Sequence, residues 1–297
     1  MRKQALVLGA SGQVGQALAQ ELASRGWDWE GSFHEHAEVS PKLFKLDLAD
    51  LDSIEAEVLA RKPSAVFLPS GWTWVDGCED DPERAFLINA HAPEAAARAA
   101  ARLNAALVYY STEYVFGREG GPYDELRATQ PLGAYGASKL EGERRVSGAW
   151  PAALLLRTTV VYGPEPQGKN FIYQLQKNLK AGKEMRLPVD QVSSPSYNRD
   201  LARASVDLVE RRLSGIWNVA GPDQINRYQF GVLAARILGL DPALLKPART
   251  SELGQKAARP LRAGLLSGKL SKTLGWSPRS AQAGLQAFAA SLGAGHG

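Results

Sequence analysis

Short apolar runs alternate in the first half of the chain with longer stretches whose apolar residues recur every three or four positions. The runs are Gln4–Leu8, Ala65–Leu68, Ala106–Tyr110 and Ala153–Thr159, and the longer stretches include Val14–Leu22, Pro93–Leu103 and Ala137–Val146. The runs predict strands and the longer stretches predict helices. Strands that alternate with helices are joined by right-handed crossovers, so the pattern predicts an α/β fold with a doubly wound parallel sheet.

The alternation becomes less regular after Gly163. The expected elements there are helices at Phe171–Ala181, Leu201–Arg212, Tyr228–Leu238 and Ala281–Leu292, a strand at Ile216–Ala220 and a polar loop at Pro188–Asn198. We interpret this part as a smaller lobe. The expected division is a first domain over residues 1–160 and a C-terminal lobe over 161–297, with some later segments returning to the first domain.

A glycine-rich turn follows the first expected strand and opens the first expected helix. It reads Gly9-Ala10-Ser11-Gly12-Gln13-Val14-Gly15. Glycine lets the backbone turn tightly and approach a pyrophosphate closely, while free N–H groups at the start of the helix attract the anion. A tight turn that needs glycine only for packing is the alternative. The strand, turn and helix context favours a dinucleotide site, which makes residues 1–160 the dinucleotide-binding domain.

The end of the second strand bears on the choice of dinucleotide. An acid that binds the ribose 2′-hydroxyl usually lies about 20 residues beyond the glycines in NAD-binding folds. In the segment Trp29–His34, Phe33 occupies that position and His34 follows it. This arrangement favours NADP (NADPH), whereas a register that uses Glu35 as the ribose acid would favour NAD.

A second set of residues has the chemistry of a proton-transfer site. Tyr135 and Lys139 are four apart, so they lie on one face of the predicted helix, where an ammonium can lower the pKa of a phenol. Ser111 and Thr112 end the strand Ala106–Tyr110, at the edge where a parallel sheet places its ligand crevice. We therefore expect Thr112, Tyr135 and Lys139 to be catalytic, with Ser111 beside them. A turn or capping hydroxyl is the alternative for Thr112.

Composition narrows the class of protein further. The chain has 297 residues, 44% of them hydrophobic, which is enough for a well-buried core. The net charge of +4 is scattered, which argues against nucleic acid as a partner. The single cysteine, Cys78, excludes an internal disulfide and has no neighbouring metal-ligand pattern, so we expect no metal site. The run Ala5–Ala10 is too short to cross a membrane and has no signal-peptide pattern, so a cytoplasmic location is expected.

Taken together, these motifs resemble the dTDP-4-dehydrorhamnose reductase family of extended short-chain dehydrogenases. The matching segments are Gly9–Gly15, Ser111–Phe116, Tyr135–Lys139, Gly142-Glu143, Val75–Glu79, Asn89, Arg157 with Val161-Tyr162-Gly163, Asp190-Gln191 with Pro195, and Arg259-Pro260. The resemblance spans essentially the whole chain. It implies a Rossmann domain that binds NADPH or NADH, a lobe that holds a nucleotide sugar, and reduction of the C4 ketone of that sugar.

The resemblance also assigns individual residues. The catalytic set is Thr112, Tyr135 and Lys139. Cofactor contacts are expected from Gly9, Ser11, Gly12, Gln13, Val14, Gly15, His34, Asp47, Leu48, Asn89, Ser111, Tyr135 and Lys139. Substrate contacts are expected from Asp76, Glu113, Tyr114 and Arg259, with Arg259 as the phosphate contact. The expected partner is a nucleotide-sugar substrate, and a homodimer is compatible with the family.

Three positions depart from the family pattern. Glu113 replaces an aspartate, Val160 replaces a tryptophan, and Pro69-Ser70-Gly71-Trp72 replaces a loop of small residues. These departures also resemble the regulatory beta subunit of methionine adenosyltransferase, which binds NADP and a partner enzyme. An NADP-binding regulatory protein without turnover is therefore one alternative function, and a nucleotide-sugar epimerase of the same superfamily is another. A dehydratase is disfavoured, because Glu113-Tyr114 does not supply the expected Asp-Glu pair.

Overall fold

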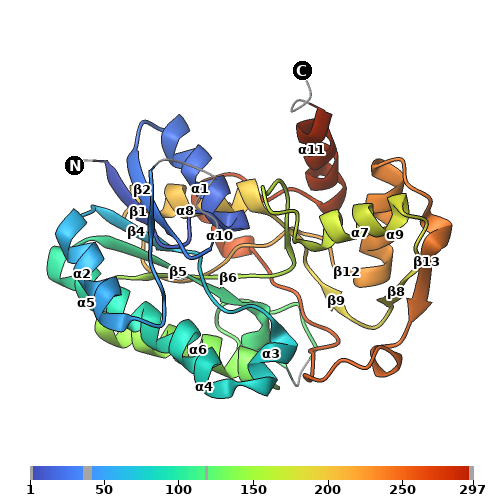
Figure 1. Ribbon diagram of the computed structural model, residues 1–297, viewed down its shortest axis with the longest axis horizontal. Coiled ribbons are helices and arrows are strands. Elements are labelled where there is room, and N and C mark those ends of the chain that lie inside the picture. Colours follow the sequence, from blue (N-terminus) through green and yellow to red (C-terminus); the bar gives the residue numbers. More distant parts are fainter. Residues whose placement is uncertain (1–2, 36–41, 118–119, 294–297) are drawn as a thin grey trace.

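The computed structural model describes residues 3–35, 42–117 and 120–293. Its centre is a seven-stranded sheet in which every pair of neighbouring strands is parallel (Figure 1). In spatial order the strands are β11 (Gly215–Asn218), β6 (Leu154–Thr158), β5 (Ala106–Thr112), β4 (Ala65–Leu68), β1 (Gln4–Val7), β2 (Asp28–Phe33) and β3 (Leu43–Lys45). Strands β3 to β6 follow the order of a Rossmann fold, which confirms the predicted fold class.

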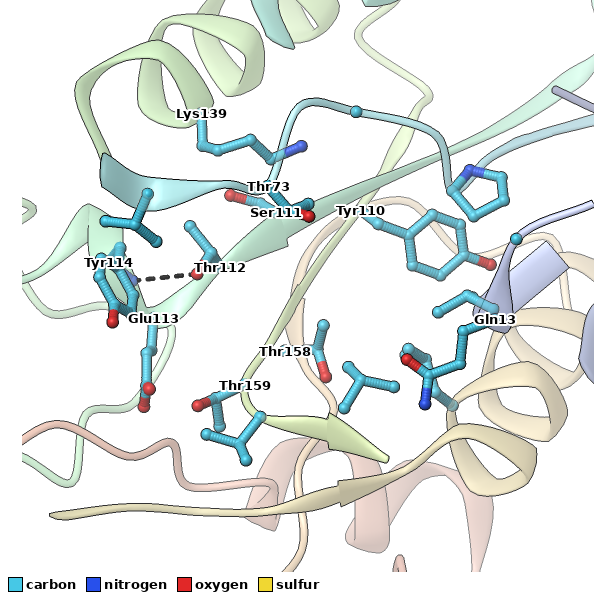
Figure 2. Close-up of a pocket in the computed structure, with 18 of the residues that line it drawn as sticks. Gln13, Thr73, Tyr110, Ser111, Thr112, Glu113, Tyr114, Lys139, Thr158 and Thr159 are labelled. Carbon is cyan, nitrogen blue, oxygen red and sulfur yellow. Dashed lines mark hydrogen bonds between the residues drawn. The ribbon is translucent and has the colours of Figure 1, made fainter. Parts of the chain in front are cut away.

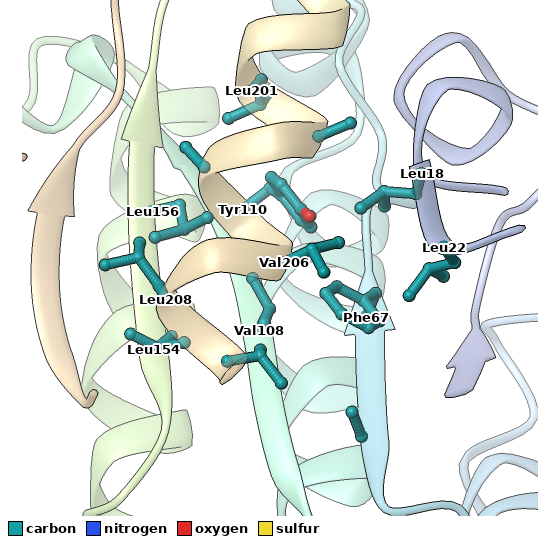
Figure 3. Close-up of a cluster of buried hydrophobic side chains, with 14 of the residues drawn as sticks. Leu18, Leu22, Phe67, Val108, Tyr110, Leu154, Leu156, Leu201, Val206 and Leu208 are labelled. Carbon is teal, nitrogen blue, oxygen red and sulfur yellow. The ribbon is translucent and has the colours of Figure 1, made fainter. Parts of the chain in front are cut away.

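Side chains along the strands alternate between two hydrophobic layers, because successive residues of a strand point to opposite faces. In β5, Val108 and Tyr110 belong to one layer, while Leu107 and Tyr109 belong to the other. Figure 3 shows the first layer, where Val108, Phe67 and side chains of α8 meet above the sheet. Both layers are buried, which explains why these strands read as continuous apolar runs.

Two groups of helices cover these faces. One face carries α1 (Gln13–Ser24), α8 (Asn198–Glu210) and α10 (Gly268–Leu274), and the other carries α2 (Leu51–Arg61), α5 (Ala92–Leu103) and α6 (Ala134–Ala149). Short helical segments α3 (Val75–Asp80), α4 (Pro82–Phe86) and a π-helical turn, Leu87–His91, lead into α5. A 3₁₀ turn, Glu113–Val115, follows β5.

The second lobe lies beyond the carboxyl end of the sheet (Figure 1). Its elements are β7 (Val161–Tyr162), α7 (Phe171–Lys180), β8 (Met185–Pro188), β9 (Val192–Ser193), β10 (Ser196–Tyr197), β12 (Ile225–Asn226), α9 (Arg227–Ile237), β13 (Leu245–Ala248) and α11 (Ala281–Gly293), with 3₁₀ turns at Pro242–Leu244 and Thr250–Glu252. The small sheets pair β10 with β7, β12 with β9, and β13 with β8. Three segments of the second half return to the first domain: β11 joins the central sheet, and α8 and α10 join its covering layer.

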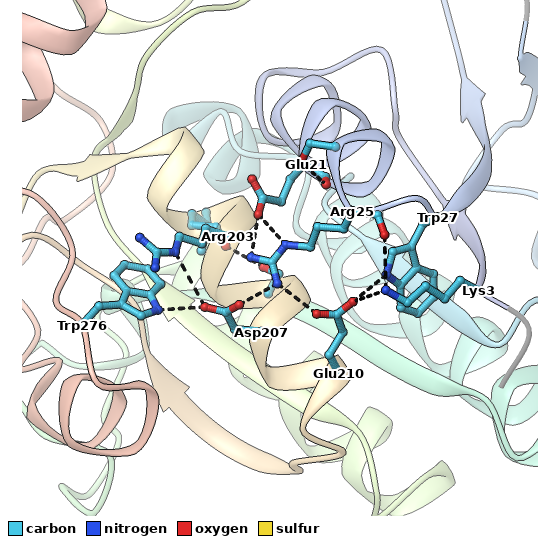
Figure 4. Close-up of polar contacts among 11 residues, drawn as sticks. Lys3, Glu21, Arg25, Trp27, Arg203, Asp207, Glu210 and Trp276 are labelled. Carbon is cyan, nitrogen blue, oxygen red and sulfur yellow. Dashed lines mark hydrogen bonds and ion pairs between the residues drawn. The ribbon is translucent and has the colours of Figure 1, made fainter.

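A charged network joins α1 to α8 across the surface of the first layer (Figure 4). The Arg25 guanidinium donates to Asp207 at 2.6 Å and to Glu210 at 3.0 Å. Burial alone would raise the pKa of Glu210, but the donors around it, Lys3 and Trp27 first among them, lower that pKa to about 2. Because several donors share two carboxylates, this network holds α8 on α1 more firmly than an isolated surface pair would.

The element predictions agree with the structure except at a few boundaries. The expected loop Pro188–Asn198 contains the short strands β9 and β10, so that prediction was wrong in part. Both strands have only two residues and pair with distant segments, which leaves no periodic signal in the sequence. Every helix in the described ranges is too short or too polar to cross a lipid bilayer.

Leu156→Ala tests the double-layered core. Leu156 is fully buried in the layer beneath α8, so its truncation leaves a cavity that the rigid sheet cannot close. We expect a loss of about 2–5 kcal/mol in the free energy of unfolding by urea. Leu126→Ala, at a side chain that is 94% exposed, is the control and should change stability by less than about 0.5 kcal/mol. Equal effects of the two substitutions would contradict this description of the core.

Candidate active site

A cavity of about 720 Å³ lies between the carboxyl ends of the central strands and the second lobe. Figure 2 shows Ser111, Thr112 and Lys139 gathered at the end of β5, with Gln13 of the glycine turn across the cavity. The predicted site residues in its wall are Gly9, Ser11, Gly12, Gln13, Val14, Gly15, His34, Ser111, Thr112, Glu113, Tyr114, Tyr135 and Lys139. Those the structure does not place in that wall are Asp47, Leu48, Asp76, Asn89 and Arg259. Both expected motifs therefore face the same space.

The glycines of the turn are needed for different reasons. Gly9 has a φ of +100°, and a Cβ there would lie 2.6 Å from the Cβ of Ser70. A Cβ at Gly15 would lie 2.2 Å from the Gly9 carbonyl oxygen, so these two glycines are explained by the protein itself. Gly12 is not, because a Cβ there would make only an ordinary contact of 3.5 Å. The packing alternative therefore leaves Gly12 unexplained, whereas close approach of a ligand explains it.

The surroundings of the turn fit a dinucleotide. Gly12 is the N-cap of α1 and offers no side-chain cap, which leaves N–H groups at the helix start available to an anion. In the part of the chain that the structure describes, Gln13 Nε2 and Thr158 Oγ1 are buried in or beside the cavity wall without a hydrogen-bond partner. Buried polar atoms are normally satisfied, so these two atoms are suited to a bound ligand.

His34 follows β2 and lines the cavity. Its ring nitrogens lie 3.8 Å from carboxylate oxygens of Glu35 and Asp47, and all three side chains are more than half exposed. Leu48 packs against the layer formed by α2 and α5. Both carboxylates therefore lie beside the His34 ring, just after the end of β2.

Tyr135 enters the cavity from the first turn of α6. Its ring packs edge-on against Tyr114, with centroids 5.4 Å apart. Burial raises the pKa of Tyr135, while a hydrogen bond with the Thr112 side chain acts in the opposite direction. Thr112 Oγ1 also accepts from the backbone N–H of Tyr114 at 3.2 Å. Thr112 and Tyr135 are therefore held side by side, with the phenol protonated at neutral pH.

Lys139 is buried one turn further along α6. Its Nζ lies 4.1 Å from the centre of the Tyr109 ring, and burial lowers its pKa to about 7, although the charge of Glu143 raises it. Its ammonium is therefore only partly populated at neutral pH, and burial outweighs any cationic influence on Tyr135. The expected lowering of the tyrosine pKa by Lys139 is not the dominant effect in this arrangement.

A buried ion pair supports the strand end from behind. Arg157 of β6 donates to Glu143 of α6 at 2.9 and 2.6 Å, and both side chains are almost fully buried. Ser111 Oγ donates to the same carboxylate at 2.5 Å. Ser111 therefore lies in the cavity wall, with its hydroxyl engaged by the ion pair.

Asn89 lies in the π-helical turn, outside the cavity wall. Its side chain accepts from the Trp72 N–H at 2.8 Å and donates to the Trp72 carbonyl at 3.0 Å and to Ser138 Oγ at 3.1 Å. It thus ties the loop after β4 to α6, as a backbone-organising amide would. Its position is consistent with an indirect role at the site, because π-helical turns often occur beside functional sites.

Glu113 lines the cavity next to Tyr114. Its side chain is 3% exposed, and its Oε2 accepts from the backbone N–H of Gly264 at 2.7 Å. Burial raises the pKa of Glu113 to about 7, although the Gly264 N–H and the charge of Arg227 lower it. Glu113, like Val160, is both a departure from the family pattern and a wall residue.

Asp76 and Arg259 meet beside the cavity rather than in it. The guanidinium of Arg259 donates to both carboxylate oxygens of Asp76 at 3.0 Å, and Asp76 also accepts from the Ala257 N–H. The pair fastens the loop that carries the wall residue Pro260 onto α3. As a phosphate contact, Arg259 would have to leave this bidentate pair.

Several wall residues were not singled out from the sequence. Gln167 donates to the Ser11 carbonyl at 3.0 Å, and Lys169 and Arg227 also line the cavity. Gln167 and Lys169 come from the irregular segment between β7 and α7, and Arg227 is the first residue of α9, and none of the three belongs to a sequence motif. Within the described ranges, no group of three or more His, Cys, Asp and Glu side chains is arranged to hold a metal ion.

The parallel sheet, the glycine turn and the Thr112/Tyr135/Lys139 cavity define a Rossmann-type protein with a second, site-completing lobe. The chain belongs to the family described as RmlD substrate binding domain, whose model matches residues 3–293. The family resemblance inferred from the motifs is thereby confirmed.

The individual relatives include proteins named as reductases and one named as an enzyme subunit. A dTDP-4-dehydrorhamnose reductase of Mycolicibacterium smegmatis is 31% identical over 96% of this chain and 81% of its own length. A methionine adenosyltransferase 2 subunit beta of Xenopus tropicalis is also 31% identical, over 91% of this chain and 82% of its own. The crystal structure of a dTDP-4-dehydrorhamnose reductase from Bacillus anthracis in complex with NADP superimposes with a TM-score of 0.86, at 27% identity, covering 97% of this chain and 99% of that one.

Glu113→Gln tests the unusual carboxyl group. A carboxyl whose pKa is raised on folding stabilises the folded state below its ordinary pKa of 4.5, and this contribution disappears as pH rises through about 7. Glutamine does not titrate and can still accept from the Gly264 N–H. From pH 4.5 to 8, we expect the free energy of unfolding to fall less in the variant than in the wild type, by up to roughly 3 kcal/mol. Denaturant unfolding across this range measures it, and parallel pH profiles would contradict the assignment.

Proposed function

We propose that this protein is an NAD(P)H-dependent reductase of a nucleotide-linked 4-keto sugar. The observation that carries the proposal is the convergence of Thr112, Tyr135 and Lys139 with the glycine turn on one cavity. A proton donor and a dinucleotide site are the two parts that ketone reduction requires, and here they share a wall. The relatives named as dTDP-4-dehydrorhamnose reductases support the choice of substrate class.

The chemistry of reduction divides between cofactor and protein. A reduced dinucleotide held at the glycine turn Gly9–Gly15 would supply the hydride to the carbonyl carbon, and the electron pair of the C=O bond would move to the oxygen. Tyr135 donates its phenolic proton to that oxygen, while Thr112 holds the oxygen by a hydrogen bond. The phenolate is then reprotonated from solvent.

The pKa shifts suit these roles. Burial raises the pKa of Tyr135, which keeps the acid form populated before the reaction. Lys139 has a pKa of about 7, and its charged form stabilises the phenolate that remains after Tyr135 has donated its proton. Its buried position over Tyr109 prevents it from turning away into solvent.

A regulatory function is the second candidate, and the relative named as a methionine adenosyltransferase subunit favours it. In that case the protein would bind the dinucleotide and a partner enzyme without reducing a sugar. Retention of all three catalytic side chains supports the reductase, because a binding protein does not need them.

Tyr135→Phe tests the reductase directly. The substitution removes the acidic hydroxyl and keeps the ring against Tyr114, so the fold and dinucleotide binding should persist. We expect NADPH consumption with a 4-keto nucleotide sugar to fall by roughly 100- to 10,000-fold. Tyr173→Phe, at a ring that packs on Phe288 in the second lobe, is the control and should retain wild-type turnover. Equal rates in Tyr135→Phe and the wild type would remove Tyr135 from the mechanism, and no consumption by the wild type across a broad sugar panel would favour the regulatory function.

The cofactor preference needs its own measurement. We propose that NADP binds at least as well as NAD, because Phe33 stands where a ribose acid is expected. Glu35 and Asp47 beside His34 act against this preference, since carboxylates repel a 2′-phosphate. Fluorescence titration with both reduced dinucleotides decides between them, and NADH bound more than about tenfold tighter, or 1.4 kcal/mol, would overturn the NADP assignment.

A further inference from the structure

Arg227 is a wall residue whose position is set by the second lobe. It begins α9, directly after β12, and its backbone N–H donates to the Gln191 carbonyl at 3.1 Å. Its guanidinium lies 4.7 Å from the centre of the Phe171 ring. The backbone and the cation–π contact with Phe171 therefore hold the side chain in place without a carboxylate and leave its N–H donors available.

The charge of Arg227 has no matched partner. Throughout the ranges that the structure describes, no carboxylate forms an ion pair with it. Glu113 is close enough to influence it, but the carboxyl of Glu113 is buried against Gly264 and has a pKa of about 7. A partly buried cation without a counter-charge is unfavourable, and burial accordingly lowers the pKa of Arg227. An anion in the cavity would remove this cost.

The neighbouring arginine differs in this respect. Arg259 is saturated by the two oxygens of Asp76, and it acts on Arg227 as a like charge. Of the two guanidinium groups at this end of the site, Arg227 lines the cavity and can accept a ligand without breaking an existing ion pair.

We infer that Arg227 binds the diphosphate of the nucleotide-linked substrate and so selects for it. This inference rests on the proposed function and names the residue that recognises the anionic part of that substrate. A guanidinium offers parallel N–H donors that match two phosphate oxygens, and such charge-assisted hydrogen bonds are stronger than neutral ones. The adjacent Tyr114 and Glu113 then face the sugar, beside Thr112 and Tyr135.

The test compares Arg227→Gln with Arg236→Gln. Arg236 is exposed on the same helix and does not line the cavity, so its substitution changes the net charge equally. Protein saturated with NADP, which occupies the cofactor phosphate sites, is titrated with thymidine diphosphate and with inorganic pyrophosphate by calorimetry. We expect about 10- to 100-fold weaker binding of both probes to Arg227→Gln, and wild-type binding to Arg236→Gln. Arg227→Lys, which keeps the charge but not the fork, should lie between them.

The outcomes separate this inference from the proposed function. Unchanged diphosphate binding in Arg227→Gln, or no binding of either probe by the wild type, would overturn the role of Arg227. A parallel loss of NADP affinity in the protein without cofactor would also overturn it, because Arg227 would then serve the cofactor. NADPH consumption with a 4-keto nucleotide sugar is measured separately, so turnover that persists in the wild type upholds the reductase even where the assignment of Arg227 fails.

Discussion

Burial of a parallel sheet on both faces is the constraint from which the rest of this structure follows. Parallel neighbours require each connection to return across a face, so the carboxyl ends of β1, β4, β5 and β6 meet at one edge. The glycine turn, the loop after β4, and Thr112 are all segments that leave that edge. Their proximity is thus a consequence of topology, and the two apolar layers that hold the sheet also hold the site.

Polar groups at this edge are supported by a second set of buried contacts. Glu143 and Arg157 join α6 to β6 and engage Ser111, while Asn89 joins the loop after β4 to the same helix. Removing one partner of a buried ion pair leaves an uncompensated charge and commonly costs about 3–5 kcal/mol. These contacts keep the face of α6 that carries Tyr135 and Lys139 in register with β5, and small displacements there would separate the donor from Thr112.

The second lobe completes the site with charges that the sheet does not provide. Arg227 approaches Glu113 from α9, and the Asp76–Arg259 pair fastens the loop that carries Pro260 beside them. The Arg259 guanidinium is therefore neutralised by Asp76, whereas the Arg227 guanidinium faces the cavity. A neutral ligand would leave the buried charge of Arg227 uncompensated, whereas an anionic group in the cavity would lower the cost of burying it.

The sequence by itself determined the features that depend on local period and spacing: the apolar runs of the strands, the turn Gly9–Gly15, and Tyr135 four residues before Lys139 on one helix face. It also placed Thr112 at a strand end, because the apolar run Ala106–Tyr110 stops just before it. In a parallel sheet, that end of a strand is where the ligand crevice forms. Only the tertiary structure decided that β11 joins the central sheet and α8 covers it, that Arg259 is paired with Asp76, 183 residues away, and that Arg227 faces the cavity. Local pattern reports which face of an element is buried, whereas the partner of a charged side chain depends on how distant segments pack, and no periodicity along the chain encodes that.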